Sequence, residues 1–190
     1  MRAFLIRVTL RSLVGALLAL ALINGTIRLL GGSTALLSPR HLPQKLHALG
    51  ALTRHLVTFR SEPPIEATLR SHSEAKGIPT DFVMALAQRE SRLTRISVSH
   101  TGAMGVMQLM PATAQALGVR DPFSVEENID GGTRLVAELW RRYRGDRCRV
   151  AAAYNAGPGR VPRRGQIRLP GETRHYMVNV VGPECRRLYR

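Results

Sequence analysis

The sequence has few aromatic residues, and its two cysteines stand apart from any cluster of metal-ligating side chains. Aromatic residues make up 5% of the 190 positions, too few for the interleaved stacking surface that a nucleic-acid groove needs. Cys148 and Cys185 have no nearby pair of histidines, so the usual zinc spacings are missing. We therefore expect no nucleic-acid partner, no metal and no cofactor.

Acidic residues are missing from positions 1–61, which hold eight of the 28 basic residues. The formal net charge of +15 divides into +8 in this leader and +7 in the remainder. Only Lys45 and Lys76 are lysines, and this excess of arginine either serves anion recognition or follows from genome base composition. Charge alone admits a nucleic acid, a membrane surface or an acidic wall polymer as partner. The shortage of aromatic residues argues against the first.

The leader has the pattern of an export signal. Arg2, Arg7 and Arg11 precede an apolar run over 13–23, which is the order of a secretory signal peptide. The run is short for a membrane span of about 20 residues, but apolar residues continue on both sides. We assign 1–30 to a signal peptide or an uncleaved signal anchor, with a buried core helix as the alternative. Under the positive-inside rule, the rest of the chain is exported.

Residues 31–61 are interpreted as a linker that contains an amphipathic helix. One face of this helix is expected to carry the apolar residues Leu46, Leu49, Leu52, Leu56 and Phe59. Two readings fit equally well. The helix rests on anionic lipid, or it packs on the following domain.

Residues 62–190 are predicted to form one mostly α domain. The positions of glycine and proline residues, which begin or end helices, predict helices over about 64–75, 81–91, 111–117, 125–143, 149–154 and 172–189. Thr80 is expected to cap the second of these helices, and Gly182-Pro183 to interrupt the last one. No alternating run is long enough to predict a strand.

Export would place the two cysteines in an oxidising compartment, where a disulfide between Cys148 and Cys185 is expected. Such a bond would tie the C-terminal tail to the body of the domain. On the chain-entropy model it is worth about 4 kcal/mol.

Glu90 is the strongest candidate for chemistry. It follows Leu86 by four residues, so it lies on the apolar face of its own helix. A carboxyl group in apolar surroundings has a raised pKa, which is the condition for a general acid near neutral pH. The equally weighted alternative is a helix-terminal glutamate that forms an ion pair with Arg89, Arg92 or Arg95.

Three further motifs carry polar groups on loops and helix ends. The segment 99–111 contains two glycines, several methionines and Gln108, which suits an apolar wall for a sugar ring or a methionine-packed core. Tyr154 and Asn155 precede a Gly-Pro-Gly break, either at a loop rim or as a capped helix end. Glu172 and Tyr176 share one helix face, which could also be plain capping.

In this order and spacing, the motifs resemble the catalytic domain of soluble lytic transglycosylases, relatives of goose-type lysozyme. The resemblance covers about 65–181. Its carriers are Glu90-Ser91, Gly102–Gln108 with Pro111, Thr113 and Ala114, Asn128-Ile129, Ala153–Gly157, and Glu172-Thr173 with Tyr176.

The resemblance implies a lysozyme-like α fold and cleavage of peptidoglycan between N-acetylmuramic acid and N-acetylglucosamine, with a 1,6-anhydro product. Glu90 would be the one catalytic acid and base, and Tyr154 would orient it. The residues implied to bind substrate are Ser99, Met107, Gln108, Tyr154, Asn155, Glu172 and Tyr176. A hydrolytic muramidase and a non-catalytic wall-binding scaffold are the alternatives.

The sequence departs from the family pattern at two positions. Val106 stands where leucine is usual, and Arg95 adds charge near the groove. Neither departure removes a catalytic group. The expected location is the periplasm, free or anchored in the inner membrane. By analogy, the expected partners are peptidoglycan strands and an envelope-spanning secretion or conjugation machine, for which the enzyme would open the wall locally.

Overall fold

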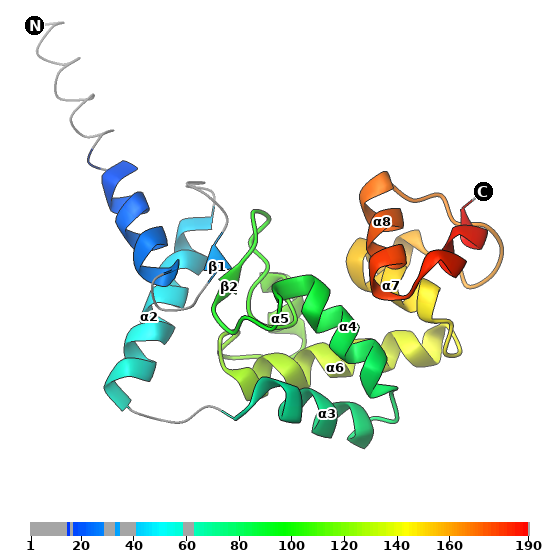
Figure 1. Cartoon of the computed structure of the whole chain (residues 1–190), viewed down its shortest axis with the longest axis horizontal. Coiled ribbons are helices and arrows are strands. Elements are labelled where there is room, and N and C mark those ends of the chain that lie inside the picture. The colour runs from blue at the N-terminus through cyan, green and yellow to red at the C-terminus, as the bar shows by residue number, and fades with distance from the viewer. Residues whose placement is uncertain (1–14, 16, 29–32, 35–40, 59–62, 190) are drawn as a thin grey trace, which may run out of the picture.

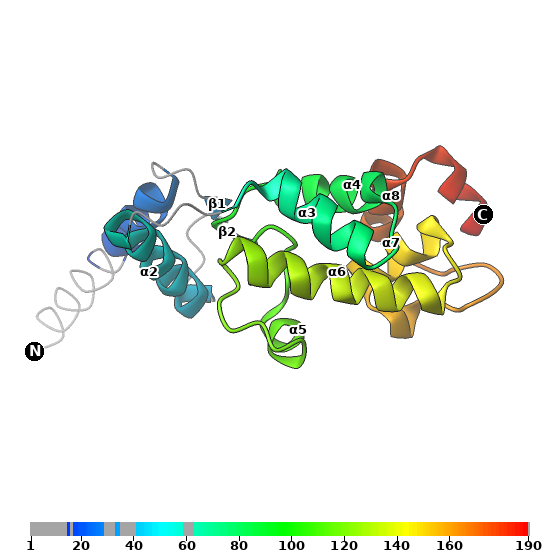
Figure 2. The same cartoon turned by 90° about the horizontal axis from the view of Figure 1, so that it is seen from below.

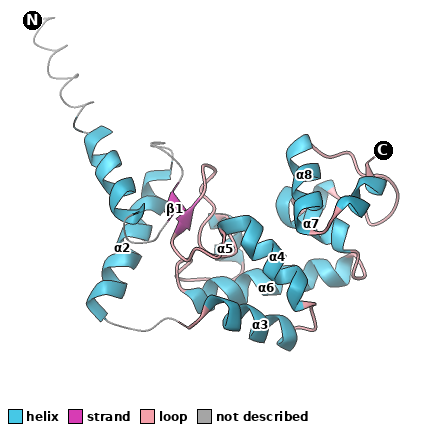
Figure 3. Ribbon diagram, in the orientation of Figure 1, coloured by secondary structure: helices cyan, strands magenta, loops and turns pink. Residues whose placement is uncertain are grey.

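The computed structural model describes residues 15, 17–28, 33–34, 41–58 and 63–189. Figure 3 shows that helices dominate these residues, which confirms the mostly α fold. Residues 17–28 are helical. The labelled helices are α2 (Leu42–Thr58), α3 (Ile65–Ala75), α4 (Thr80–Ser91), α5 (Pro111–Ala116), α6 (Val125–Arg142), α7 (Arg147–Ala156) and α8 (Gly171–Val180). Two 3-10 helices follow α7 and α8, η2 (Pro158–Arg160) and η3 (Pro183–Leu188).

The expectation of no strand is wrong for one short pair. β1 (Ser33–Thr34) and β2 (Ser97–Val98) are parallel, with Ser33 opposite Ser97. Each strand has only two residues, so no alternating pattern could have revealed them. The pair joins the N-terminal segment to the loop that follows α4.

The helices of the domain pack around one hydrophobic cluster. Figures 1 and 2 show α3, α4 and α6 side by side, with α7 and α8 at one end of the molecule and α2 at the other. Leu69 of α3, Phe82 and Leu86 of α4, Ile129 of α6 and Met177 of α8 are all buried in this cluster. The core therefore holds α4, α7 and α8 in fixed relation, and these helices carry the candidate catalytic side chains.

Side-chain caps begin two helices, but not the helix at which one was expected. The Ser124 hydroxyl accepts a hydrogen bond from the Glu127 amide at the start of α6, and the Asp146 carboxylate accepts one from the Arg149 amide at the start of α7. Thr80 is the first residue of α4, and Pro79 occupies the cap position without a side-chain bond. The prediction of a Thr80 cap is thus wrong by one residue.

Helix α2 packs on the domain around a second hydrophobic cluster. Ala48 and Ala51 of α2 are buried with Val98 of β2 and Phe123. Of the residues predicted on the apolar face, Leu49 is partly buried against this cluster, whereas Leu46 is 50% exposed, so the buried face coincides only in part with the one expected. The side chains of Leu52, Leu56 and Phe59 fall outside the described part of the chain. The contacts favour packing on the domain over a lipid-bound helix.

The described residues 17–28 of the segment 1–30 are helical, but the predicted signal or anchor stays a prediction. Leu17, Leu18 and Leu22 are exposed on this helix, whereas Ile27 is buried in the second cluster. The basic residues Arg2, Arg7 and Arg11 lie outside the described residues. Within the described ranges, no helix combines the length and the apolar character that a membrane crossing requires.

The expected disulfide is present. Cys148 at the start of α7 is bonded to Cys185 of η3. The bond closes a loop with a sequence separation of 37 residues. It anchors the segment that follows α8 to α7, and the break expected at Gly182-Pro183 separates α8 from η3.

Candidate active site

Glu90 lies at the carboxyl end of α4, at the point where that helix stops. Arg92 and Leu93 both have left-handed backbones, with φ of 56° and 59°, which no helix can continue through. The chain therefore turns away immediately after Ser91. Glu90 stays on the apolar face of α4, as its helical spacing predicted, and there it meets Tyr176 of α8.

Tyr176 is the hydrogen-bond partner of the Glu90 carboxyl group. Its hydroxyl donates to Glu90 Oε1 over 2.5 Å, across 86 positions of sequence and between α8 and α4. Burial, followed by the nearby Glu90 charge, raises the pKa of Tyr176 well above its ordinary value. Tyr176 therefore keeps its proton and remains a donor at any pH near neutrality.

Burial raises the pKa of Glu90 to about 7. Two effects oppose burial and favour the carboxylate, namely the hydrogen bond from Tyr176 and the positive charge of Arg89. The Arg89 guanidinium carbon lies 5.8 Å from the centre of the Tyr176 ring. Glu90 is thus held by a tyrosine, not by the arginine ion pair that was the alternative.

The loop between β2 and α5 forms one wall of the site and is fastened to α6 by Asn128. This fully buried side chain accepts a hydrogen bond from the Met107 amide at 2.7 Å and donates to the carbonyls of Met104 and Pro122. Gly105 has φ of +77°, and a Cβ there would lie 2.2 Å from the Pro122 carbonyl oxygen. Only glycine allows this approach.

Gln108 and Ser99 shape the same loop from within. Gln108 Nε2 donates to the carbonyls of Gly105 and Ser97, at 2.8 and 3.2 Å. Because both partners are acceptors, the amide orientation is fixed. The Ser99 hydroxyl accepts from the Ala103 amide at 2.9 Å. Both residues line the cavity described below.

The contacts of this wall differ from two expectations. The hydroxyl of Tyr154 on α7 donates to the Met107 carbonyl at 2.7 Å and not to Glu90. Met107 does not line the site, because its side chain is fully buried and packs where a Cβ on Gly132 would lie. Its contribution is the backbone carbonyl that holds Tyr154.

These groups surround an open cavity of about 230 Å³. Seven of the predicted site residues line it: Glu90, Ser99, Gln108, Tyr154, Asn155, Glu172 and Tyr176. Sequence reasoning missed five more: Arg89, His100, Thr101, Ala103 and Met110. All five lie within the motifs or next to them in sequence. This proximity to the predicted site residues was the one sequence feature that could have identified them.

The cavity contains two carboxyl groups, those of Glu90 and Glu172, and burial raises the pKa of Glu90 to about 7. Among the residues that the structure describes, no three histidine, cysteine or acidic side chains gather as metal ligands would. A partly buried acid with a pKa near 7 in an open cavity can both give and take a proton at neutral pH. Fold and site together define a helical domain built for acid–base chemistry on a bound ligand.

The family model of the Transglycosylase SLT domain matches residues 68–176. This is more than half of the chain, and it contains both Glu90 and Tyr176. The chain belongs to this family, which confirms the resemblance that its motifs indicated.

Individual relatives match about half of the chain. The chain is 35% identical to the soluble lytic murein transglycosylase of Escherichia coli K12 over 48% of this chain and 16% of the relative. It is 35% identical to peptidoglycan transglycosylase gp16 of phage T7 over 47% of this chain and 7% of the relative. It is 39% identical to the transglycosylase of phage PRD1, over 47% and 34%. The alignments thus span about a third or less of each relative.

Two solved structures share the fold. The 70 kDa soluble lytic transglycosylase of Escherichia coli matches with a TM-score of 0.54 and 30% identity, over 60% of this chain and 22% of that one. An inactive mutant of lytic transglycosylase Slt from Pseudomonas aeruginosa matches with a TM-score of 0.55 and 28% identity, over the same shares.

Proposed function

We propose that this protein is a peptidoglycan lytic transglycosylase, which cleaves the β-1,4 bond between N-acetylmuramic acid and N-acetylglucosamine. The observation that carries the proposal is Glu90, a mostly buried acid with a pKa of about 7 that receives a hydrogen bond from Tyr176 in an open cavity. Membership of the Transglycosylase SLT domain family supports it.

Glu90 acts twice in the proposed reaction. The protonated carboxyl first donates its proton to the glycosidic oxygen, and the bond from the muramic C1 to that oxygen breaks. The resulting carboxylate then takes the proton of the muramic O6 hydroxyl while O6 bonds to C1. The products are a 1,6-anhydromuramic end and a free sugar hydroxyl, and Glu90 regains its proton without water. A pKa near 7 suits both steps because each protonation state is accessible.

The other cavity residues bind the strand in this proposal. Tyr176 is a positioning residue, because it acts through Glu90. Gln108 uses both of its described bonds on Nε2, so its carbonyl oxygen remains an acceptor for a substrate amide or hydroxyl. Asn155 and Glu172 lie on the rim, at the end of α7 and the start of α8, where sugar hydroxyls would meet them.

Hydrolysis by two carboxylates is the competing reaction. It needs a second carboxyl group about 5–9.5 Å from the first. Glu172 is the other acid that lines the cavity, and it lies in the first turn of α8, on a different helix from Glu90. Two carboxyl groups therefore line the cavity, and this competing reaction has to be separated from the proposed one by its products.

Product analysis separates these reactions. Purified sacculi are digested with the full chain, and the released muropeptides are analysed by mass spectrometry. Anhydro ends are expected, 18 mass units lighter than the hydrolytic products because one water is missing. Products with reducing ends alone would refute the lyase assignment and establish a muramidase.

A variant pair tests the role of Glu90. Glu90→Gln should abolish sacculus solubilisation and keep sacculus binding, since the amide can still accept the Tyr176 hydrogen bond but cannot carry the proton. Glu74→Gln makes the same chemical change on an exposed residue of α3 and should remain active. If Glu90→Gln turned over substrate at the wild-type rate, Glu90 would not be the acid. A wild-type chain that binds sacculi but releases nothing would be a scaffold.

We further propose that the chain acts in the periplasm, where it opens the wall locally for an envelope-spanning assembly. The basic, acid-free leader supports export, and two of the relatives are transglycosylases of phages T7 and PRD1. Fractionation of cells that express the full chain tests the location. Periplasmic or inner-membrane recovery is expected, and the mass of the recovered protein shows whether the leader has been cleaved.

A further inference from the structure

A second cavity, larger than the catalytic one, lies at the carboxyl end of α6. Its volume is about 650 Å³, within the range of small-ligand sites. Its lining consists of five arginines and one tyrosine: Arg141, Arg142, Tyr143, Arg144, Arg163 and Arg164. It shares no lining residue with the cavity around Glu90, so the proposed wall cleavage does not use it.

The arginines come from two segments that are distant in sequence. Arg141 and Arg142 end α6 and Arg144 follows it, whereas Arg163 and Arg164 belong to the loop between η2 and α8. No acidic residue lines the cavity. Across the described part of the chain, none of the five forms an ion pair. Five arginines thus border one cavity that has no acidic residue in its lining, and one of them, Arg141, also borders a neighbouring cavity that includes Glu138.

Buried side chains hold the loop in place. Arg149, buried on α7, donates to the carbonyls of Pro162 and Gly165, both at 2.6 Å. These two carbonyls stand on either side of the Arg163–Arg164 pair. The Tyr143 hydroxyl adds a bond to the Val161 carbonyl at 2.9 Å. The loop is therefore positioned before any ligand arrives, which lowers the entropic cost of binding.

The helix dipole explains only part of this arrangement. Arg141 and Arg142 lie in the last turn of α6, where cations are favoured. Arg163 and Arg164 belong to no helix, and holding them beside three other cations adds repulsion. A bound anion would relieve that repulsion. Guanidinium groups form paired hydrogen bonds with phosphate oxygens, so phosphate is the chemistry that this lining fits.

We propose that this cavity binds an anion carrying two or more phosphate groups, either a soluble phosphate ester or a phospholipid headgroup. One phosphate would engage only some of the five guanidinium groups, and the cavity has room for a larger ligand. The site recruits or holds the protein at a phosphate-bearing component of the envelope, while the glycan strand occupies the cavity around Glu90.

Titration with pyrophosphate tests the soluble ligand. The full chain is titrated at low salt by calorimetry, with citrate as a carboxylate of comparable charge. Saturable pyrophosphate binding is expected, with citrate weaker. Arg163→Gln/Arg164→Gln should weaken the pyrophosphate affinity by about tenfold or more, since charge-assisted bonds are lost. Equal binding of citrate would overturn the assignment to phosphate.

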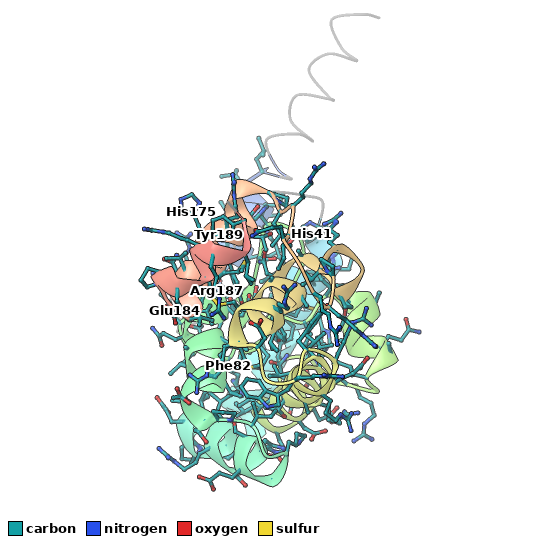
Figure 4. The ribbon with its side chains drawn as sticks, turned by 90° about the vertical axis from the view of Figure 1, so that its right-hand side faces the viewer. His41, Phe82, His175, Glu184, Arg187 and Tyr189 are labelled. Atoms are coloured by element: carbon teal, nitrogen blue, oxygen red, sulfur yellow. A yellow bond between two sulfur atoms is a disulfide. The ribbon has the colours of Figure 1, made fainter. Side chains whose placement is uncertain are left out.

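A matched double variant controls for net charge. Arg186→Gln/Arg187→Gln removes the same charge from exposed residues of η3, which do not line the cavity. Arg187 is labelled in Figure 4. This control should bind pyrophosphate like the wild type. An equal loss in both double variants would show diffuse charge attraction and overturn the site. Thermal unfolding confirms that both variants are folded.

Vesicles test the lipid source. Co-sedimentation compares vesicles that contain cardiolipin, whose headgroup carries two phosphates, with neutral phosphatidylcholine vesicles, using the same two variants. Both variants retain the leader, so the difference between them isolates the cavity. Selective loss by Arg163→Gln/Arg164→Gln on cardiolipin alone identifies a headgroup, and selective loss with pyrophosphate alone identifies a soluble phosphate compound. If the wild type binds neither ligand, the proposal is wrong.

Discussion

Opposing effects around Glu90 set its acidity. Burial alone would drive the pKa of this carboxyl group higher, and Tyr176 and Arg89 restrain it at about 7. The restraint matters because a still higher pKa would make Glu90 a weaker proton donor, whereas a much lower one would leave it ionised and unable to donate. A single substitution that removes the Tyr176 hydrogen bond or the Arg89 charge should therefore shift the pH dependence of activity in a predictable direction.

Tyr176→Phe should move the alkaline limb of the activity profile to higher pH. The hydroxyl stabilises the Glu90 carboxylate, so its removal raises the Glu90 pKa further, by about one unit for a bond to a charged group. Because the first step needs the protonated acid, activity would persist to higher pH. Sacculus turnover from pH 5 to pH 9 measures the limb.

Tyr154→Phe is the control for this shift. It removes a buried hydroxyl from the same cavity, but the bond that it breaks is to the Met107 carbonyl. The maximal rate of Tyr154→Phe can decrease. The alkaline limb of its activity profile should shift less than that of Tyr176→Phe. Equal shifts in the two variants would mean that Tyr176 does not act through its bond to Glu90.

Glu90→Gln should stabilise the fold at alkaline pH. The pKa of Glu90 rises from 4.5 to about 7 on folding, so the native state holds a proton that the unfolded chain has lost between these values. The wild-type free energy of unfolding therefore falls as pH rises through this window, by about 3 kcal/mol in total. Glutamine has no such proton. In urea unfolding, the variant should match the wild type near pH 4.5 and exceed it at pH 8, whereas Glu74→Gln should follow the wild type throughout.

Local spacing predicted the Glu90 environment, but it could not assign hydrogen bonds between helices. The i, i+4 relation to Leu86 placed the carboxyl on a buried face, as the structure has it. The choice between Tyr154 and Tyr176 depended on how α7 and α8 pack against α4, which is decided by contacts across 86 positions. Met107 was misplaced for a similar reason, because its burial results from the close approach of Gly132 on α6.

At the scale of elements, the wall of the cavity is a loop whose shape depends on one glycine and one asparagine. Asn128 bonds three backbone groups around the turn, and Gly105 makes room for it. The Gln108 and Tyr154 contacts are built on this turn. A substitution of Gly105 should consequently displace the side chains of the cavity as well as destabilise the fold.

Gly105→Ala should destabilise the protein and reduce activity together. The left-handed backbone alone costs about 1–2 kcal/mol with a Cβ, and the collision with the Pro122 carbonyl and Asn128 adds to it. Gly118→Ala is the matched control, because its φ is +69° but nothing lies within 4 Å of the added Cβ. Chemical denaturation should show the larger loss at Gly105. Equal losses would mean that backbone strain alone matters.

Helix positions were predictable where glycine and proline mark the ends. α3, α5 and α6 agree with the sequence prediction to within about one residue, and the break before η3 was expected. The β1–β2 pair and the buried face of α2 were not predictable. Both depend on how the N-terminal segment docks on the loop after α4, and residue periodicity within α2 contains no information about that partner surface.

At the scale of the molecule, the described chain has two hydrophobic clusters and one covalent cross-link. The cross-link serves the larger cluster, since Cys148 and Cys185 are both buried in it. The segment that it closes includes the loop of Arg163 and Arg164 as well as α8 with Tyr176. One bond therefore restrains both the proposed catalytic cavity and the proposed phosphate cavity.

Cys148→Ala/Cys185→Ala should lower the free energy of unfolding by about 4 kcal/mol, because the loop of 37 residues is no longer closed in the unfolded chain. Thermal unfolding measures the loss, and dithiothreitol added to the wild type should reproduce it.

Alanine also leaves two small voids in the core. The reduced wild type retains both sulfur atoms, so it separates the effect of losing the cross-link from the effect of losing packing. At a temperature at which both forms are folded, activity should be largely retained, since the core still seats α8. A reduced wild type as stable as the oxidised form would show that the bond does not restrain the unfolded chain.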